Sequence, residues 1–265
     1  MGADARWPAG TGLGHAGAMS GPVNRMFPIL LAASFMLAAS GCTQGQGGVS
    51  SQTRDFSEPT HAQFARAIRE GDEGLARELL AAGANPNATD EAGTPLLQWA
   101  MREGDRGAVS RLLALGADPA RPDARGRTAM HEAAMAPHAD WIDELLGHGV
   151  PVDIPNARNG QTPLFDALRA REPGNIDRLL DAGARLDVGD RSGTTPLHQA
   201  AMVNDLASVR RFLEAGADPS VRDARGADLA SYLYDGDPDM LTARARRDLE
   251  WIRARLSDGA GPAPQ

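Results

Sequence analysis

The sequence predicts an all-α solenoid built from about five stacked helix–turn–helix repeats. A Gly-Ala-Asp/Asn triplet recurs at 83–85, 116–118 and 216–218, with weaker copies at Gly149 and Gly183, so successive glycines are 33, 33, 34 and 33 residues apart. A second glycine keeps the same rhythm, at Gly93, Gly126, Gly160, Gly193 and Gly226. Apolar residues between these glycines fall at helical spacing. A fixed period of this length indicates units that cannot bury their apolar faces alone and must stack on their neighbours.

The stretch 195–216 shows how one unit is built. Thr195 is a suitable cap for a helix whose first turn carries Pro196, where the missing N–H does no harm. A polar break at 204–205 then starts a second helix. Its apolar residues lie three or four positions apart or adjacent, at Leu206, Val209, Phe212 and Leu213. Gly216 ends this helix, because the left-handed conformation at a helix end favours glycine.

The stretch from 62 to 225 closely resembles the ankyrin repeat. The family's leucine position is occupied by Phe64, Leu97, Met130, Leu164 and Leu197, and its histidine position by Ala65, Gln98, His131, Phe165 and His198. The resemblance implies a finger loop after each helix pair, and a structural role for His131 and His198 through hydrogen bonds to the finger backbone. It also implies motif positions at the helix starts, namely Thr128, Thr162, Thr195, Pro163 and Pro196. In the second repeat, Thr94-Pro95 comes one residue early.

Both ends depart from the repeat pattern, as terminal repeats that shield a core from water must. Residues 61–80 form a shortened, charged first unit. Residues 239–256 predict a longer C-terminal capping helix, with an inner stripe of Leu241, Ala245, Leu249, Ile252 and Leu256. The expected repeat domain is therefore 61–256, followed by a disordered tail at 257–265.

Residues 25–42 have the pattern of a secretory signal. Arg25 precedes an apolar run at 26–39, which is shorter than the about 20 residues that cross a bilayer, and small residues lead to Cys42. Cys42 is the only cysteine, so no internal disulfide is expected. Residues 1–22 lack a charged signal start, which leaves Met1, Val23 and Met26 as alternative translation starts.

The ending "AASGC" resembles the lipobox of bacterial lipoproteins. The resemblance implies that residues 1–41 are removed and that Cys42 becomes the acylated first residue, since two or more acyl chains anchor a protein durably. Residues 42–60 are expected to form a flexible tether. No aspartate follows Cys42, which by the same resemblance favours the outer membrane over the inner. An ordinary cleaved signal with an incidental cysteine is the alternative.

Composition and motifs argue against several classes of function. The formal net charge is -8, all 27 cationic residues are arginine, and no basic tract is present, which disfavours nucleic acid as a partner. No nucleophile motif, phosphate-binding loop or dinucleotide fingerprint is found. No His/Cys/Asp cluster has the spacing of metal ligands. We therefore expect no enzyme activity, no catalytic residue, no metal and no cofactor.

A partner-binding face is predicted where the resemblance places the finger tips and the exposed sides of the first helices. Its residues are Trp99, Arg102, Arg125, Arg127, Met135, Arg158, Arg169, Arg191, Met202 and Val203. Arginine and methionine are enriched at interfaces, so this row suits a protein with an acidic rim and an apolar anchor. The alternative is that the tip arginines pair with aspartates of their own turns, at Asp123, Asp190 and Asp223, while the methionines pack between repeats.

Together these features predict a lipid-anchored, periplasm-facing protein that serves as an interaction module or scaffold in the bacterial envelope. We expect a monomer that binds a protein partner such as a periplasmic enzyme. The alternative is an immunity protein that binds and neutralises a secreted antibacterial toxin.

Overall fold

The structure is a computed structural model that describes residues 56, 58–137 and 140–257. These residues belong to one compact unit, Gly48–Gln265. Cys42, the expected signal, most of the expected tether and residues 258–265 lie outside the described part of the chain.

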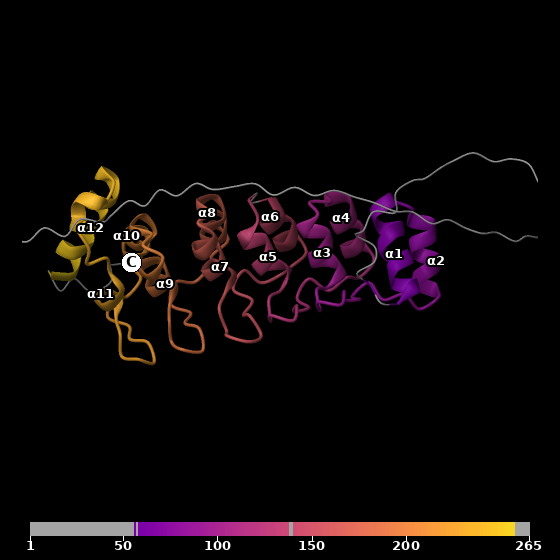
Figure 1. Ribbon diagram of the computed structural model, residues 1–265, viewed down its shortest axis with the longest axis horizontal. Coiled ribbons are helices and arrows are strands. Elements are labelled where there is room, and N and C mark those ends of the chain that lie inside the picture. Colours follow the sequence, from indigo (N-terminus) through magenta and orange to yellow (C-terminus); the bar gives the residue numbers. More distant parts are fainter. Residues whose placement is uncertain (1–55, 57, 138–139, 258–265) are drawn as a thin grey trace, which may run out of the picture. The chain divides into compact units, whose positions relative to one another are not determined.

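The described residues form six helix pairs, which Figure 1 shows in chain order with the finger loops on one side. The pairs are α1 (Pro59–Glu70) with α2 (Glu73–Ala81), α3 (Leu96–Arg102) with α4 (Arg106–Ala114), α5 (Ala129–Met135) with α6 (Asp140–Gly147), α7 (Pro163–Ala170) with α8 (Pro173–Asp181), α9 (Pro196–Met202) with α10 (Leu206–Glu214), and α11 (Leu229–Tyr232) with α12 (Ala243–Ser257). The described part contains no strand, only one isolated bridge between Thr89 and Pro95. The predicted all-α solenoid is confirmed, and we number the repeats one to five from α1–α2 to α9–α10.

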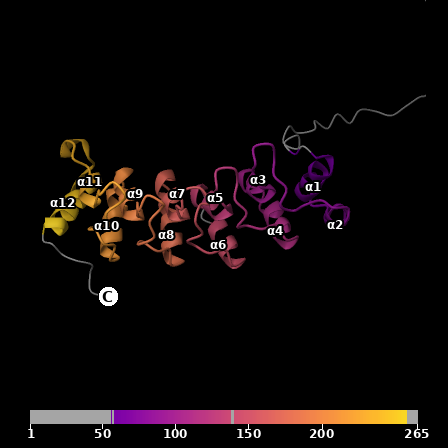
Figure 2. The ribbon, with the colours of Figure 1, turned by 90° about the horizontal axis from the view of Figure 1, so that it is seen from below.

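The first helices of the pairs form one row, and the second helices form another. Figure 2 shows the odd-numbered helices in one row, the inner row, and the even-numbered helices in the other, the outer row. One continuous core lies between them, and it includes the family's leucine position, with Phe64, Leu97, Met130, Leu164 and Leu197 at most 2% exposed. None of the described helices has the length and apolar character needed to cross a membrane.

Consecutive fingers are joined to one another by backbone hydrogen bonds. The amide nitrogens of Ala124, Ala157, Arg191 and Ala224 donate to carbonyl oxygens of the preceding finger, at 3.2, 2.8, 2.9 and 2.7 Å. The next finger also passes close to the Cα of Gly126. This glycine has a φ of +81°, and a Cβ on it would lie 2.8 Å from the backbone nitrogen of Arg158. The recurring glycines of the fingers therefore allow both the left-handed turn and the close approach of the next finger.

The N-terminal boundary differs from the expectation. Phe56, which the sequence assigns to the flexible tether, is only 4% exposed and packs edge-on against Trp99, with ring centroids 6.2 Å apart. Helix α1 begins at Pro59, inside the expected tether, because proline at the first helical position has a suitable φ and needs no N–H partner. The ordered repeat unit therefore includes residues that composition alone assigns to a linker.

The C-terminal end has a truncated sixth pair. Helix α11 has 4 residues, and α12, the capping helix, has 15. Residues 238–240 form a 3-10 turn, η2 (Pro238–Met240), so α12 starts at Ala243 rather than at 239. Along the expected stripe, Leu249 and Ile252 are buried, while Leu241, Ala245 and Leu256 are half-buried against the core.

Candidate interaction surface

The predicted face corresponds to the exposed sides of the inner-row helices and the fingers, which we call the inner face. Four of its predicted residues, Arg102, Arg125, Arg127 and Met135, line two hollows over the second and third repeats. Arg102 lines both hollows, so they adjoin each other.

The first hollow, the apolar hollow, has a volume of about 250 Å³. It is lined by Met101, Arg102, Glu132, Met135, Ala136, Pro137 and Trp141. One wall of this hollow is formed by the turn of the third repeat. In this turn Pro137 keeps Ala136 extended, with ψ at 145°. The corresponding turns of the other repeats contain a residue with positive φ, at Gly71, Gly104, Arg171 and Asn204.

The second hollow, the basic hollow, has a volume of about 340 Å³. It lies toward the fingers and is lined by Ala92, Thr94, Arg102, Asp123, Ala124, Arg125 and Arg127. The Asp123 carboxylate is buried and accepts hydrogen bonds from the backbone nitrogens of Arg125 and Arg127 and from the Arg127 guanidinium. The alternative that tip arginines pair with their own turn aspartates therefore describes Arg127.

Arg102 is also held by carboxylates of the next repeat. Its Nε and Nη2 donate to the two carboxylate oxygens of Glu132, at 2.9 and 3.0 Å, and Nη2 lies 3.6 Å from Asp123. The hydrogen bond with Glu132 raises the pKa of Arg102. Asp123 and Glu132 thus share the two guanidiniums of Arg102 and Arg127. The exposed side chain of Arg125 has no ion pair or hydrogen bond to any described residue.

The next two finger tips also present arginines that pair with no carboxylate of the described residues. Arg158 donates to the carbonyl oxygen of Ala124 at 3.2 Å, and Arg191 donates to that of Ala157 at 2.7 Å. Both are exposed. These contacts order the arginines along the fingers without cancelling their charge, so the own-turn alternative does not describe them.

The last finger is different. Arg225 pairs with Asp223 at 3.2 Å, and the Tyr232 hydroxyl donates to the same carboxylate at 2.5 Å. The hydrogen bond from Tyr232, with further bonds from this turn, lowers the pKa of Asp223 to about 2. Arg225 therefore stabilises its own turn, as the alternative proposes.

The remaining predicted residues are separated or engaged elsewhere. Arg169 bonds to Asp166 and, at 2.9 Å, to Gln161. Met202 is 50% exposed, and Val203 beside it is half-buried. The sulfur of Met135, also half-buried, accepts a hydrogen bond of 3.6 Å from Arg127, and Met202 does not line the hollow that contains Met135. Trp99 is only 7% exposed and packs edge-on against Phe56, and it lines neither of the two hollows.

The two motif histidines join neighbouring repeats. The Nδ1 atoms of His131 and His198 lie 2.9 Å from the hydroxyls of Thr128 and Thr195, and their Nε2 atoms lie 3.0 and 3.1 Å from carbonyls of the following finger. Burial lowers the pKa of His131, which favours the neutral ring. No group of three or more metal-ligating side chains occurs in the described residues.

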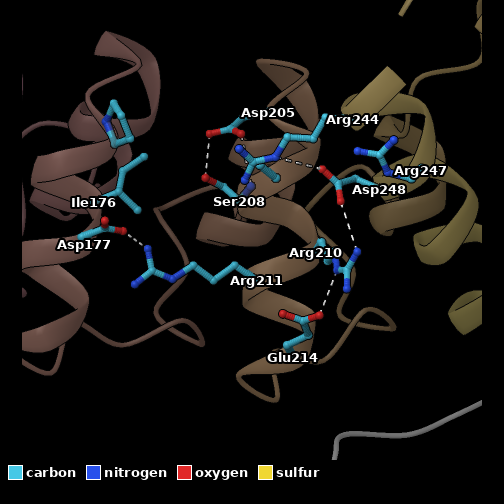
Figure 3. Close-up of a pocket in the computed structure, with 12 residues that line it drawn as sticks. Ile176, Asp177, Asp205, Ser208, Arg210, Arg211, Glu214, Arg244, Arg247 and Asp248 are labelled. Atoms are coloured by element: carbon cyan, nitrogen blue, oxygen red, sulfur yellow. Dashed lines mark hydrogen bonds and ion pairs between the residues drawn. The ribbon is translucent and has the colours of Figure 1, made fainter. Parts of the chain in front are cut away.

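Sequence reasoning missed a hollow of about 680 Å³, which lies on the outer row (Figure 3). It runs along α10 between α8 and α12, which requires packing of the capping helix that no local pattern predicts. Its charged groups largely neutralise one another: Arg211 pairs with Asp177, Arg210 with Glu214 and Asp248, and Asp205 accepts from Ser208. Arg247 also lines it. With acids and arginines interleaved and no apolar anchor, this hollow gives no indication of a ligand.

The comparisons with known proteins agree with this geometry. A family model described as ankyrin repeats (3 copies) matches residues 64–156 and 138–223. Among 547 matching chains of solved structures is the ankyrin repeat domain of Bcl-3, described as a unique member of the IkappaB protein family. That match has a TM-score of 0.59 and 24% identity, and covers 72% of this chain and 81% of the other. At this identity the likeness concerns the fold. No curated protein matches the chain.

Proposed function

Because this chain belongs to the ankyrin-repeat family, whose repeats serve as protein-interaction modules, we propose that its inner face binds a protein partner at the surface of a bacterial membrane. In this proposal Cys42 carries the lipid anchor, the repeat unit faces the periplasm, and the protein is a non-enzymatic, monomeric scaffold for an envelope protein. The outer membrane is the proposed location.

The observation that carries partner binding is the row of unneutralised arginines on successive fingers. Arg125, Arg158 and Arg191 are exposed and have no carboxylate partner among the described residues, although the chain as a whole is acidic. Folding alone does not require this, because exposed arginines of the outer row pair with acids of the neighbouring repeat, as Arg106 does with Asp140. An acidic protein surface would supply the missing charges.

Lipid anchoring is tested on the mature protein. Mass spectrometry of the N-terminal peptide should show Cys42 as the first residue with acyl chains attached. The Cys42→Ser variant should be unprocessed at this site and lose its lipid. A mature chain that begins at another residue would refute the anchor and leave the interaction surface unaffected.

Partner binding is tested by crosslinking in intact cells of the native host, using the full chain with a C-terminal affinity tag. We expect a resident envelope protein to be captured by the wild type and lost from a variant with Arg125, Arg158 and Arg191 all changed to glutamate. Capture of a secreted toxin instead would assign immunity as the function. Equal capture by the triple variant would overturn the assignment of the inner face.

A further inference from the structure

We propose that the partner inserts one apolar side chain into the apolar hollow and places a carboxylate beside Arg125 in the basic hollow. This inference rests on the proposed function and narrows it to one part of the inner face, the second and third repeats. It also specifies the chemistry of the bound segment, which is an acidic stretch of protein with an apolar residue close to its acidic residue.

The apolar hollow has the size and lining of a side-chain anchor. At about 250 Å³ it is smaller than the roughly 300–1,000 Å³ of most small-molecule sites, so it fits a side chain better than a free ligand. Met101 and Met135 line it, and unbranched methionines adapt to the shape of an inserted group. Trp141 and Pro137 supply rigid walls. Burial of an apolar group in such a hollow is the type of contact that dominates binding energy at interfaces.

Charge complementarity indicates which residue of the partner lies next to the inserted apolar side chain. The two nearby carboxylates, Asp123 of the basic hollow and Glu132 of the apolar hollow, are already bonded to Arg127 and Arg102. The exposed guanidinium of Arg125 retains all its donors. A partner carboxylate is suited to this position, because a planar guanidinium can donate two parallel hydrogen bonds to it.

The two hollows are close enough for one short segment to fill both. Arg102 lines each of them, and its bidentate bond to Glu132 holds its guanidinium at their shared border. Arg158 and Arg191 continue the positive row along the next fingers. An anionic polymer without apolar side chains would leave the apolar hollow empty, so a protein segment matches the surface better than a nucleic acid.

A random peptide display library selected on the mature chain provides the first test. We expect enriched peptides to share an apolar residue within a few positions of aspartate or glutamate. With the best such peptide as the probe, Arg125→Glu should weaken binding at least about tenfold, because it places like charges together. Met135→Asp should weaken it about a hundredfold, because it puts a charge in the anchor site.

Matched variants separate a local effect from a general one. Arg77→Glu makes the same charge change at a 66% exposed residue of α2, and Met240→Asp makes the same substitution at an 81% exposed residue of η2. Both should bind the peptide like the wild type. Because Met135 is half-buried, the helicity of its variant is checked by circular dichroism, and Arg125→Glu at an exposed tip is the variant that does not touch the core.

Two results would overturn the inference. One is selection of peptides without acidic residues, or of none at all. The other is undiminished binding of the probe by both Arg125→Glu and Met135→Asp. If in-cell capture is then lost in the triple arginine variant but not in Met135→Asp, the proposed function stands and the anchor lies elsewhere on the inner face.

Discussion

The third and fourth repeats use different chemistry at the same junction between finger and inner helix. In the third repeat, His131 bonds to the hydroxyl and backbone nitrogen of Thr128 and to the next finger. In the fourth repeat, Phe165 occupies the histidine position and is fully buried. The hydroxyl of Thr162 is consequently buried without a partner among the described residues. One junction is stabilised by hydrogen bonds, and the other by apolar packing.

The turn between the two helices of a repeat also differs between the third repeat and the others. In the third repeat, α5 is followed by Ala136 in an extended conformation and by Pro137, whereas the turns of the other repeats contain a residue with positive φ. The amide of Asn175, in the fourth repeat, donates to the carbonyls of Ala133, Ala134 and Ala136 at 3.3, 3.0 and 2.7 Å. The comparison teaches that each repeat need not satisfy its own polar groups, because a neighbour can do so.

The largest effect is expected from Asn175→Ala. The substitution leaves carbonyls of the third repeat without a buried donor, so the free energy of unfolding should fall by about 2–3 kcal/mol in urea titrations. Alanine fits this position, since Ala108, the third residue of α4 as Asn175 is of α8, is fully buried. The control is Ser208→Ala in α10, where the side chain bonds only within its own helix start. A loss equal to that of the control would contradict the bridging role.

The next effect comes from giving the third repeat the residue of the fourth. His131→Phe removes the bonds to Thr128 and to the carbonyl of Gln161, and we expect it to cost about 2 kcal/mol. His131→Gln should cost less, because Gln98 already uses its amide at this position to reach carbonyls of Arg121 and Arg127. Both variants are compared by thermal and urea unfolding. A loss from His131→Gln as large as or larger than that from His131→Phe would contradict the contribution of these hydrogen bonds.

Replacing the capping threonines by valine isolates a single hydroxyl. Thr128→Val should lower the free energy of unfolding by about 1 kcal/mol, because the partner of a buried hydrogen bond is lost. Thr162→Val should have no measurable cost, or should stabilise the protein slightly, because that hydroxyl is buried without a partner. Similar losses for the two variants would remove the distinction between the repeats.

The smallest effect is a pH dependence of the free energy of unfolding. It comes from the third repeat, because the fourth has Phe165 at the histidine position. Burial lowers the pKa of His131, so the unfolded chain binds the proton more readily than the folded one. Stability should therefore fall as the pH drops below about 6.5, the ordinary histidine value, toward the lowered folded pKa. His131→Gln should show a shallower loss between pH 7.5 and 5.5 in parallel urea titrations. A slope identical to that of the wild type would exclude His131 as the source.

Much of the fold is readable because its determinants are local. The glycines recur once in each repeat, and the helical spacing of the apolar positions and the capping residues lie within one repeat. Together they predict the helix pairs and their order. The contacts of His131 and His198 with the fingers follow from their family positions. The hydrogen bonds of Asn175 could not be predicted in this way, because its partners lie 39 to 42 residues away and the repeat pattern does not mark this position.

The sequence by itself determined the all-α class, the repeat period and the helix pairs of the central repeats, and it predicted a set of arginines and methionines for the inner face. Only the tertiary structure decided which of them remain free. Arg102, Arg127 and Arg169 pair with acidic residues, Trp99 packs against Phe56, and Arg125 has no carboxylate partner in the described part of the chain. The physical reason is that helix formation depends on neighbours a few positions away, whereas an ion pair or a covered ring depends on residues that only the stacking of repeats brings together.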